Sequence, residues 1–398
     1  MTSKFSIGLG AKGAGWHAGA ATLGGFAPQD PTAWAQLART ADEAGIDVLS
    51  IEDSLAPVGT SASFDTFALT NWLVPQTTRI GLVPAATTTQ LEPFHTATAV
   101  QTLDFTSQGR AGVRLRTGGA AAELAAVGRE DALGDVRAAR SLPAAEFERL
   151  IGDRFAEGVE FAQVLRLLWD SWEDDAEIRD LATSRFIDRD RLHNPAFVGE
   201  HFSVFGASIT PRPPQGQPPV FALAHTFLPY RFAAITADVA LITPETEGTL
   251  DEILAQLAEA AVAVERRGSE LKVWADYNIL IADDAPARLA ELDAAGGAFA
   301  SDAGLLAGTA QEVAARILEF RDAGLDGIRV RPVVTDRDTE AFISGVLPTL
   351  RAEGIAPAEG ANLRERLGLA PAANQFVAEP PFTANAAALT STTQEVSA

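Results

Sequence analysis

The chain has 398 residues and no cysteine, and its 31 lysines and arginines against 53 aspartates and glutamates give a net charge of −22 at pH 7. This charge repels phosphate backbones and anionic lipid surfaces, which argues against nucleic acid and membranes as partners. The absence of cysteine excludes disulfides, a thiolate nucleophile and zinc sites built on cysteine. The first residues lack the basic start and long apolar run of a signal peptide, so we expect a cytoplasmic protein.

The first part of the chain alternates short apolar strands with amphipathic helices. Asp30 is a good helix N-cap with Pro31 at the first helical position, and Gly45 is a good stop signal for that helix. About a dozen residues of helix from Pro93 are a suitable crossover between two parallel strands. We predict strands at 5–9, 47–53, 79–89 and 111–117, with helices at 30–45, about 64–74 and 93–105.

The alternation of strands and helices stops after residue 119 and resumes near residue 220. A long helix is predicted at 144–172, followed by an insertion at about 173–218 that is rich in aspartate, arginine and proline, with an irregular hairpin at 201–209. Further strands are predicted at 220–224, 239–242, 272–281 and 327–333, with helices at 228–236, 250–267, 309–324 and 339–353. Residues 283–308 read as a helical, alanine-rich excursion, and 354–398 as an Ala/Pro/Thr-rich tail that wraps the barrel or is loose.

Eight strands with intervening helices fit a closed (β/α)8 TIM barrel better than an open doubly wound sheet. No GxGxxG sequence opens a helix after a strand, so the dinucleotide-binding fingerprint is absent. We therefore predict one barrel over residues 1–353, with insertions over its C-terminal mouth. Because the ligand site of this fold lies where strands meet their following loops, the candidate segments are 10–25, 53–54, 87–89, 117–119, 225–226 and Arg331.

Two histidines fall in these candidate segments. His17 lies in a glycine-rich loop at the expected mouth and is the best single candidate for a catalytic or ligand-binding side chain. His225 follows a predicted strand and offers a hydrogen-bond donor there. Histidines and carboxylates show no ligand spacing anywhere in the chain, so we predict no metal site.

Arginines alternate with apolar residues on two predicted strands. Arg114 and Arg116 lie on one face of their strand, and Arg329 and Arg331 lie on one face of theirs. If the apolar faces meet the helices, these arginines point into the barrel and need counter-charges there. We name Glu52 and Asp276 as possible partners in an internal salt-bridge network. The alternative is an anionic ligand, either a phosphate or a substrate carboxylate.

Several sequence segments resemble the bacterial luciferase-like superfamily, in particular its flavin-dependent monooxygenases of nitrilotriacetate, dibenzothiophene sulfone and long-chain alkanes. The most specific matches are the LDxxSxGR pattern at 103–110 and LWDSWEDDA at 168–176. Weaker matches, in the same order along the chain, are GWHAGA, DVLSIEDS, the PRPPQGQPP run and GTAQEVAARILEFRDAGLDGIRV. The resemblance implies a reduced-flavin-dependent monooxygenase of a small organic substrate, supplied with FMNH2 by a separate flavin reductase and assembled as a homo-oligomer.

The resemblance also implies a role for individual residues. It makes His17 the catalytic candidate near the substrate, and it places the cofactor-binding residues at Asp53, Thr87, Arg114, Thr117, His225 and Thr226. Thr226 takes the place of the phosphate-binding serine at a helix start, where free backbone N–H groups favour an anion.

The chain departs from the family pattern at several cofactor positions. Arg114 replaces an asparagine, Ile151 and Phe155 replace a histidine and a tyrosine, and Pro229 replaces a glycine near the phosphate. We therefore expect FMN to bind weakly and with a different geometry. The alternatives are a deazaflavin-dependent oxidoreductase on the same fold, or a non-catalytic paralogue or subunit without a working flavin site.

Overall fold

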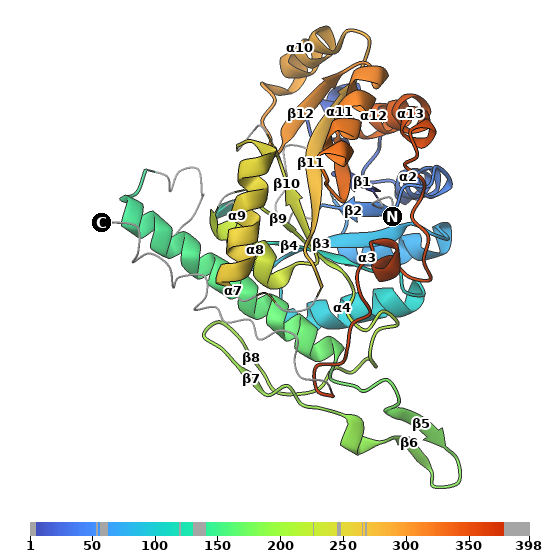
Figure 1. Cartoon of the computed structure of the whole chain (residues 1–398), viewed down its shortest axis with the longest axis vertical. Coiled ribbons are helices and arrows are strands. Elements are labelled where there is room, and N and C mark those ends of the chain that lie inside the picture. Colours follow the sequence, from blue (N-terminus) through green and yellow to red (C-terminus); the bar gives the residue numbers. More distant parts are fainter. Residues whose placement is uncertain are drawn as a thin grey trace.

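Eight parallel strands close into a barrel in the computed structural model, which describes residues 5–52, 55, 63–118, 121–129, 141–225, 227–244, 248–264, 266 and 269–377 (Figure 1). Each strand pairs with the next in the order β1, β2, β3, β4, β9, β10, β11 and β13, and β13 pairs with β1. The strands are β1 (Ser6–Ala11), β2 (Val48–Ile51), β3 (Gly81–Thr87), β4 (Val113–Arg116), β9 (Val220–Leu223), β10 (Val239–Ile242), β11 (Lys272–Ile281) and β13 (Gly327–Pro332). The predicted (β/α)8 barrel is confirmed.

Helices pack on the outside of the barrel, and several begin at side-chain N-caps, of which Asp30 was predicted. The Asp30 side chain accepts a hydrogen bond from the Thr32 N–H, and Thr249 and Thr309 each form a capping box. The outer helices are α2 (Pro31–Glu43), α3 (Thr66–Leu73), α4 (Pro93–Thr106), α7 (Ala144–Trp169), α8 (Phe227–Thr236), α9 (Leu250–Ala263), α11 (Ala310–Asp322), α12 (Thr335–Ala341) and α13 (Leu347–Ala352). A π-helical turn at Phe342–Val346 joins α12 to α13, so this helical region begins at Thr335 instead of the predicted residue 339.

Strand alternation divides the apolar core from the polar interior. Ile328 and Val330 of β13 belong to the large hydrophobic core, which also contains residues of the covering helices. Their neighbours Arg329 and Arg331 are also fully buried, but they form ion pairs with carboxylates of other strands. Because successive side chains of a strand point to opposite faces, the two arginines face the barrel interior as predicted.

The excursion at residues 283–308 contains a strand that the sequence reading missed. It begins with α10 (Ala285–Gly296) and ends with β12 (Gly304–Gly308), which pairs in parallel with residues 277–281 of β11. The lower part of β11 pairs with β10, so β12 extends the sheet only near the mouth. The run GLLAG is short and follows an alanine-rich helix, which is why a helical excursion was predicted.

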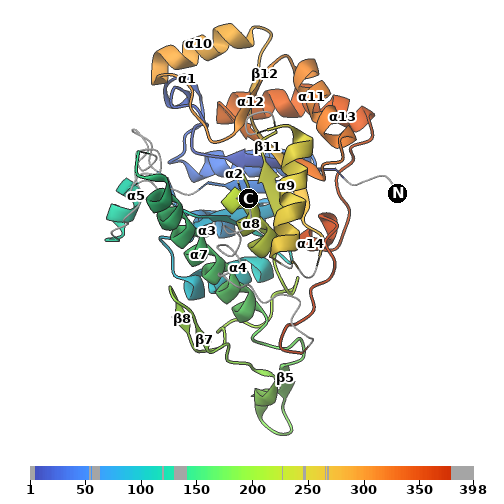
Figure 2. The ribbon, with the colours of Figure 1, turned by 60° about the vertical axis from the view of Figure 1, so that its left-hand side comes forward.

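The segment at residues 173–218 does not lie over the mouth. Helix α7 runs back from the mouth, so the chain leaves it at the N-terminal ends of the strands, where Gln101 of α4 donates to the Thr210 and Pro211 carbonyls. Its two small hairpins, β5 (Glu177–Asp180) with β6 (Arg185–Ile187) and β7 (Phe197–Val198) with β8 (Ser203–Val204), lie at the opposite end of the molecule from α10 (Figures 1 and 2). The predicted position is therefore wrong, and the predicted hairpin at 201–209 is replaced by β7 and β8.

The chain after α13 covers the N-terminal end of the barrel. Leu363 in the short helix α14 (Leu363–Arg366), together with Leu367 and Leu369, packs with inward-facing residues of five strands. These strand residues include Val48, Val83 and Trp274. Residues 378–398 of the predicted tail lie outside the described part of the chain. None of the helices in the described part is long and apolar enough to cross a membrane.

The substitution Leu363→Ala tests this closure. Leu363 has an exposed fraction of 0%, so its truncation leaves a cavity among the lower barrel residues. We expect a loss of about 2–5 kcal/mol in the free energy of unfolding, measured by urea denaturation. The matched control is Val377→Ala, because Val377 lies on the same segment with an exposed fraction of 66%. Equal and small losses for the two variants would contradict the claim that the tail is part of the core.

Candidate functional site at the barrel mouth

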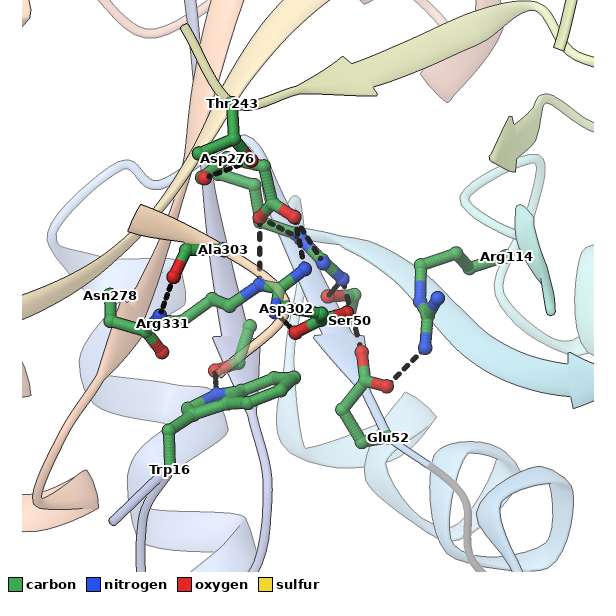
Figure 3. A network of polar contacts seen from close by, with 12 residues as sticks. Trp16, Ser50, Glu52, Arg114, Thr243, Asp276, Asn278, Asp302, Ala303 and Arg331 are labelled. Atoms are coloured by element: carbon green, nitrogen blue, oxygen red, sulfur yellow. Dashed lines mark hydrogen bonds and ion pairs between the residues drawn. The ribbon is translucent and has the colours of Figure 1, made fainter. Parts of the chain in front are cut away.

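Three arginines and three carboxylates form one connected network inside the barrel (Figure 3). At its centre, Asp276 of β11 accepts hydrogen bonds from both Arg329 and Arg331. Arg329 reaches the Asp276 carboxylate oxygens at 2.8 and 2.9 Å, and its Nη1 lies 3.0 Å from Glu52 Oε1. Arg331 Nη1 lies 2.5 Å from Asp302 Oδ1, and Arg114 Nη2 bonds the other oxygen of Glu52. The predicted partners Glu52 and Asp276 are confirmed.

The network keeps its members ionised despite their burial. Burial raises the pKa of Asp276 and of Glu52, but the neighbouring arginines outweigh it and hold both pKa values below the ordinary range. Burial lowers the pKa of Arg114 to about 10 against the opposing effect of Glu52, so this guanidinium is still charged at neutral pH. A charge in such a site persists only with paired partners and hydrogen bonds. The carboxylates are therefore structural counter-ions of the arginines.

Residues 283–308 supply the third carboxylate of the network, Asp302, from the mouth side of the barrel. Asn278 of β11 donates from Nδ2 to Ser301 Oγ and to the carbonyls of Ala303 and Gly304, which fixes the loop that carries Asp302. The guanidinium of Arg331 also lies over the ring of Trp16, 4.3 Å from its centroid. Trp16 is held in turn by a 2.9 Å hydrogen bond from its Nε1 to the Gly10 carbonyl. An arginine stacked on an aromatic face and bonded to two carboxylates has little freedom to move.

His17 connects the glycine-rich loop to α10. Its Nδ1 accepts a hydrogen bond from the Gly19 N–H at 2.9 Å, so the proton of the neutral ring lies on Nε2, which donates to Asp293 Oδ1 at 3.0 Å. The ring stacks on Phe299, and the hydrogen bond from His17 lowers the pKa of Asp293. A Cβ atom on Gly19 would lie 2.4 Å from the Leu292 carbonyl, so this close approach requires glycine. Both ring nitrogens of His17 are thus engaged within the protein.

Hydroxyl groups line the carboxyl ends of β3 and β4. Thr87 is the last residue of β3 and is buried, and Thr88 Oγ1 donates to the Arg116 carbonyl at 3.2 Å. Thr117 follows β4 and is half-buried, and its methyl group would lie 2.7 Å from a Cβ atom on Gly158 of α7. Glycine at residue 158 therefore lets α7 approach this end of the barrel closely.

Buried donors and acceptors without a protein partner gather at this mouth. They are Arg114 Nε and Nη1, Thr89 Oγ1 and Asn278 Oδ1. Native structures leave few buried polar atoms unsatisfied, and those that remain often meet water or a ligand. No group of three or more His, Cys, Asp or Glu side chains in the described part of the chain is arranged to hold a metal ion.

The structure brings several of the predicted site residues to the same end of the barrel. Thr87, Thr117, His17 and His225 lie at or beyond strand ends at the mouth, and Arg114 lies within β4 and bonds Glu52 in the barrel interior. Burial raises the pKa of Asp302, whereas Arg331 and then His225 lower it, so His225 lies near this carboxylate. Asp53 and Thr226 lie outside the described residues. Sequence reasoning placed Trp16 in the candidate segment 10–25 without giving it a role, and it missed Asp293 and Asp302. The topology offered one signal for Asp293 and Asp302, since residues 283–308 follow a strand and a segment that follows a strand must begin at the mouth.

Replacing Asp276 by asparagine tests the network. The amide cannot neutralise two buried guanidinium groups, so we expect a loss of about 3–5 kcal/mol in the free energy of unfolding. Asp322→Asn, which alters the exposed pair with Arg321, serves as the control, with an expected change of at most about 1 kcal/mol. The folded pKa of Asp276 lies below its ordinary value of 3.8, so this stabilisation is present above that pH and is lost as the pH falls below it. The variant should lose less stability than the wild type over that acidic range.

Replacing Asp293 by alanine tests the contact between His17 and α10. Without the carboxylate, we expect faster amide hydrogen exchange in α10 and in residues 297–303, with the barrel strands unchanged. Glu291→Ala removes another carboxylate from the same helix and is the matched control. Unchanged exchange in the Asp293 variant would show that the loop and α10 are held by packing alone.

Comparisons with known proteins agree with this fold. The model of the family described as luciferase-like monooxygenase matches residues 6–300. N-acetyl-S-(2-succino)cysteine monooxygenase of Bacillus subtilis (strain 168) is 27% identical over 456 residues, covering 94% of this chain and 100% of the relative. Nitrilotriacetate monooxygenase component A of Aminobacter aminovorans is 33% identical over 230 residues, covering 54% of this chain and 47% of the relative.

Solved structures show the same architecture. A long-chain alkane monooxygenase superposes with a TM-score of 0.76 at 19% identity, covering 92% of this chain and 96% of the other. Riboflavin lyase, solved with modified FMN and riboflavin, superposes with a TM-score of 0.75 at 21% identity, covering 97% of this chain and 99% of the other. The family model covers well over half of the sequence, and the chain therefore belongs to the luciferase-like monooxygenase family of enzymes.

Proposed function

We propose that this protein is a reduced-flavin-dependent monooxygenase that uses FMNH2 and O2 to oxidise a small organic substrate. The observation that carries the proposal is the group of buried, unpartnered polar atoms at the barrel mouth of a luciferase-like monooxygenase. Those atoms are the groups that a bound polar ligand would satisfy.

The residues at the mouth fit a flavin in part. Thr87, Thr117 and His225 offer hydroxyl and imidazole groups to it, and the start of α8 beside His225 offers backbone N–H groups to its phosphate. Asp53 and Thr226 complete the proposed set. By contrast, Ile151 and Phe155 of α7 are apolar, and the Phe155 ring packs on Phe232 with centroids 5.5 Å apart. This side of the site offers a flavin packing contacts but no side-chain hydrogen bonds.

A reduced flavin supplies the electrons that activate O2 when it is bound. The protein's own part is to bind, orient and exclude water. The network of arginines and carboxylates fixes the floor of the site, because its buried charges hold each other in one arrangement. The contact from His17 to Asp293 holds α10 beside the glycine-rich loop and so restricts solvent access from that side. In this proposal His17 acts by positioning this cover.

A flavin reductase and self-association belong to the same proposal. The Aminobacter aminovorans relative is named as component A of a monooxygenase, which supports a separate protein as the source of FMNH2. The homo-oligomer rests on the family resemblance alone.

A deazaflavin-dependent oxidoreductase is the second candidate. An F420-dependent secondary alcohol dehydrogenase, solved with an F420-acetone adduct, superposes with a TM-score of 0.60 at 16% identity. A protein with the same barrel fold therefore binds F420, a deazaflavin. The apolar side chains of Ile151 and Phe155 are compatible with either ring system.

Titration of the purified protein with FMN, FMNH2 and F420 tests the proposal. We expect FMN and FMNH2 to bind and F420 not to bind. FMN binding should be weak and is measured by the change in flavin fluorescence. The double change Ile151→His with Phe155→Tyr should tighten FMN binding about tenfold or more, because two polar contacts each contribute about 0.5–1.5 kcal/mol.

Arg149→His is the matched control, since it adds a histidine at an exposed residue of the same helix. It should leave FMN affinity unchanged. Tight wild-type binding that the double change does not improve would contradict the altered flavin contacts. Binding of F420 alone would favour the second candidate, and binding of no flavin by any variant would favour a non-catalytic member of the family.

A further inference from the structure

Arg114 differs from the other two arginines of the network in how its nitrogens are used. Nε, Nη1 and Nη2 of Arg329 and of Arg331 all donate to oxygen atoms of the protein. Arg114 donates only from Nη2, to Glu52, and its Nε and Nη1 are buried without a hydrogen-bond partner. Figure 3 shows its guanidinium at the edge of the network, on the far side of Glu52 from Asp302 and Trp16.

The charges of the buried part of the network do not balance. Arg114, Arg329 and Arg331 have exposed fractions of 1%, 2% and 0%, whereas only Glu52 and Asp276 are carboxylates of comparable burial. Asp302, the third carboxylate, has a side chain that is 50% exposed and contacts Arg331 at the other end of the network. Glu52 is shared between Arg114 and Arg329. Arg114 therefore shares its one counter-charge with Arg329, and the carboxylate that completes the charge balance lies at the other end of the network, so an anion bound beside Arg114 would add a counter-charge there.

We propose that Arg114 binds a carboxylate of the substrate, so that the substrate is a small organic acid. This inference rests on the proposed function for the identity of the site and adds the chemical class of its substrate. Guanidinium nitrogens are strong, directed donors to carboxylate oxygens.

A substrate carboxylate suits this position better than the phosphate of the cofactor. Arg114 is the second residue of β4 and bonds Glu52 in the barrel interior, whereas the proposed phosphate site is at the start of α8, outside the ring of strands. A phosphate dianion also carries more charge than the one guanidinium of Arg114 would neutralise. The two sources of an anion are distinguished by experiment.

The test is isothermal titration calorimetry of the full-length protein with acetate, succinate and benzoate, each paired with its neutral amide. Titrations are made with and without saturating FMN. We expect at least one carboxylate to bind while its amide does not. Arg114→Gln should weaken that binding by about tenfold or more, and Arg114→Lys should weaken it less, because lysine keeps the charge but loses the planar donors.

The matched control is Arg366→Gln, which removes another buried arginine with an unpartnered nitrogen, in α14 at the opposite end of the barrel. It should leave carboxylate binding unchanged. Circular dichroism establishes which variants fold, and Arg114→Lys carries the test if the glutamine variant does not.

Three outcomes would overturn the inference. No carboxylate binding in either cofactor condition would mean that water alone satisfies Arg114. Equal carboxylate binding by wild type and the Arg114 variants would place the acid elsewhere. Loss of FMN affinity in the variants with riboflavin affinity unchanged would assign Arg114 to the phosphate. Arg114-dependent carboxylate binding without any flavin binding would refute the proposed monooxygenase and leave this anion subsite standing.

Discussion

The interior of this barrel depends on one carboxylate, Asp276, that is shared by two buried arginines. Its carboxylate receives hydrogen bonds from Arg329 and Arg331, which lie two residues apart on the adjacent strand β13. A slip of one residue in β13 would turn both arginines toward the apolar helices and leave Asp276 buried without a counter-charge. The same interaction thus fixes the register of the strand that closes the barrel against β1 and sets the charge of the floor on which a ligand would lie.

Much of this arrangement was accessible from the sequence because it follows from periodicity. The alternation of arginine with isoleucine, valine and leucine on two strands determined which side chains enter the barrel, and burial then required carboxylates, of which Glu52 and Asp276 were named. The eight barrel strands were also recognisable, since most are short apolar runs and several are followed by a helix with a side-chain N-cap. These features depend on neighbours in sequence or on a single repeating rule.

The features that were missed depend on contacts between distant segments. Asp302 reaches Arg331 only because Asn278 holds the loop after α10, and β12 forms only because the upper half of β11 has a free edge. The predicted position of residues 173–218 was wrong. The direction of the preceding helix α7 would have given the right one, because a helix that runs back from the mouth ends at the N-terminal ends of the strands. His17 was singled out correctly as a mouth residue, but its two hydrogen-bond partners come from a neighbouring glycine and from α10.

The packing of Leu363, Leu367 and Leu369 beneath the barrel has a consequence for synthesis on the ribosome. These residues share one apolar cluster with Val48, Val83 and Phe221, which emerge much earlier. The lower layer of the barrel therefore remains open to solvent until almost the whole chain has left the exit tunnel. Strand β1 must likewise wait for β13, so a nascent chain holds an unpaired strand edge and an uncovered apolar layer at the same time. A chain that ends before residue 363 keeps this apolar layer uncovered, and we expect its soluble yield to fall for that reason.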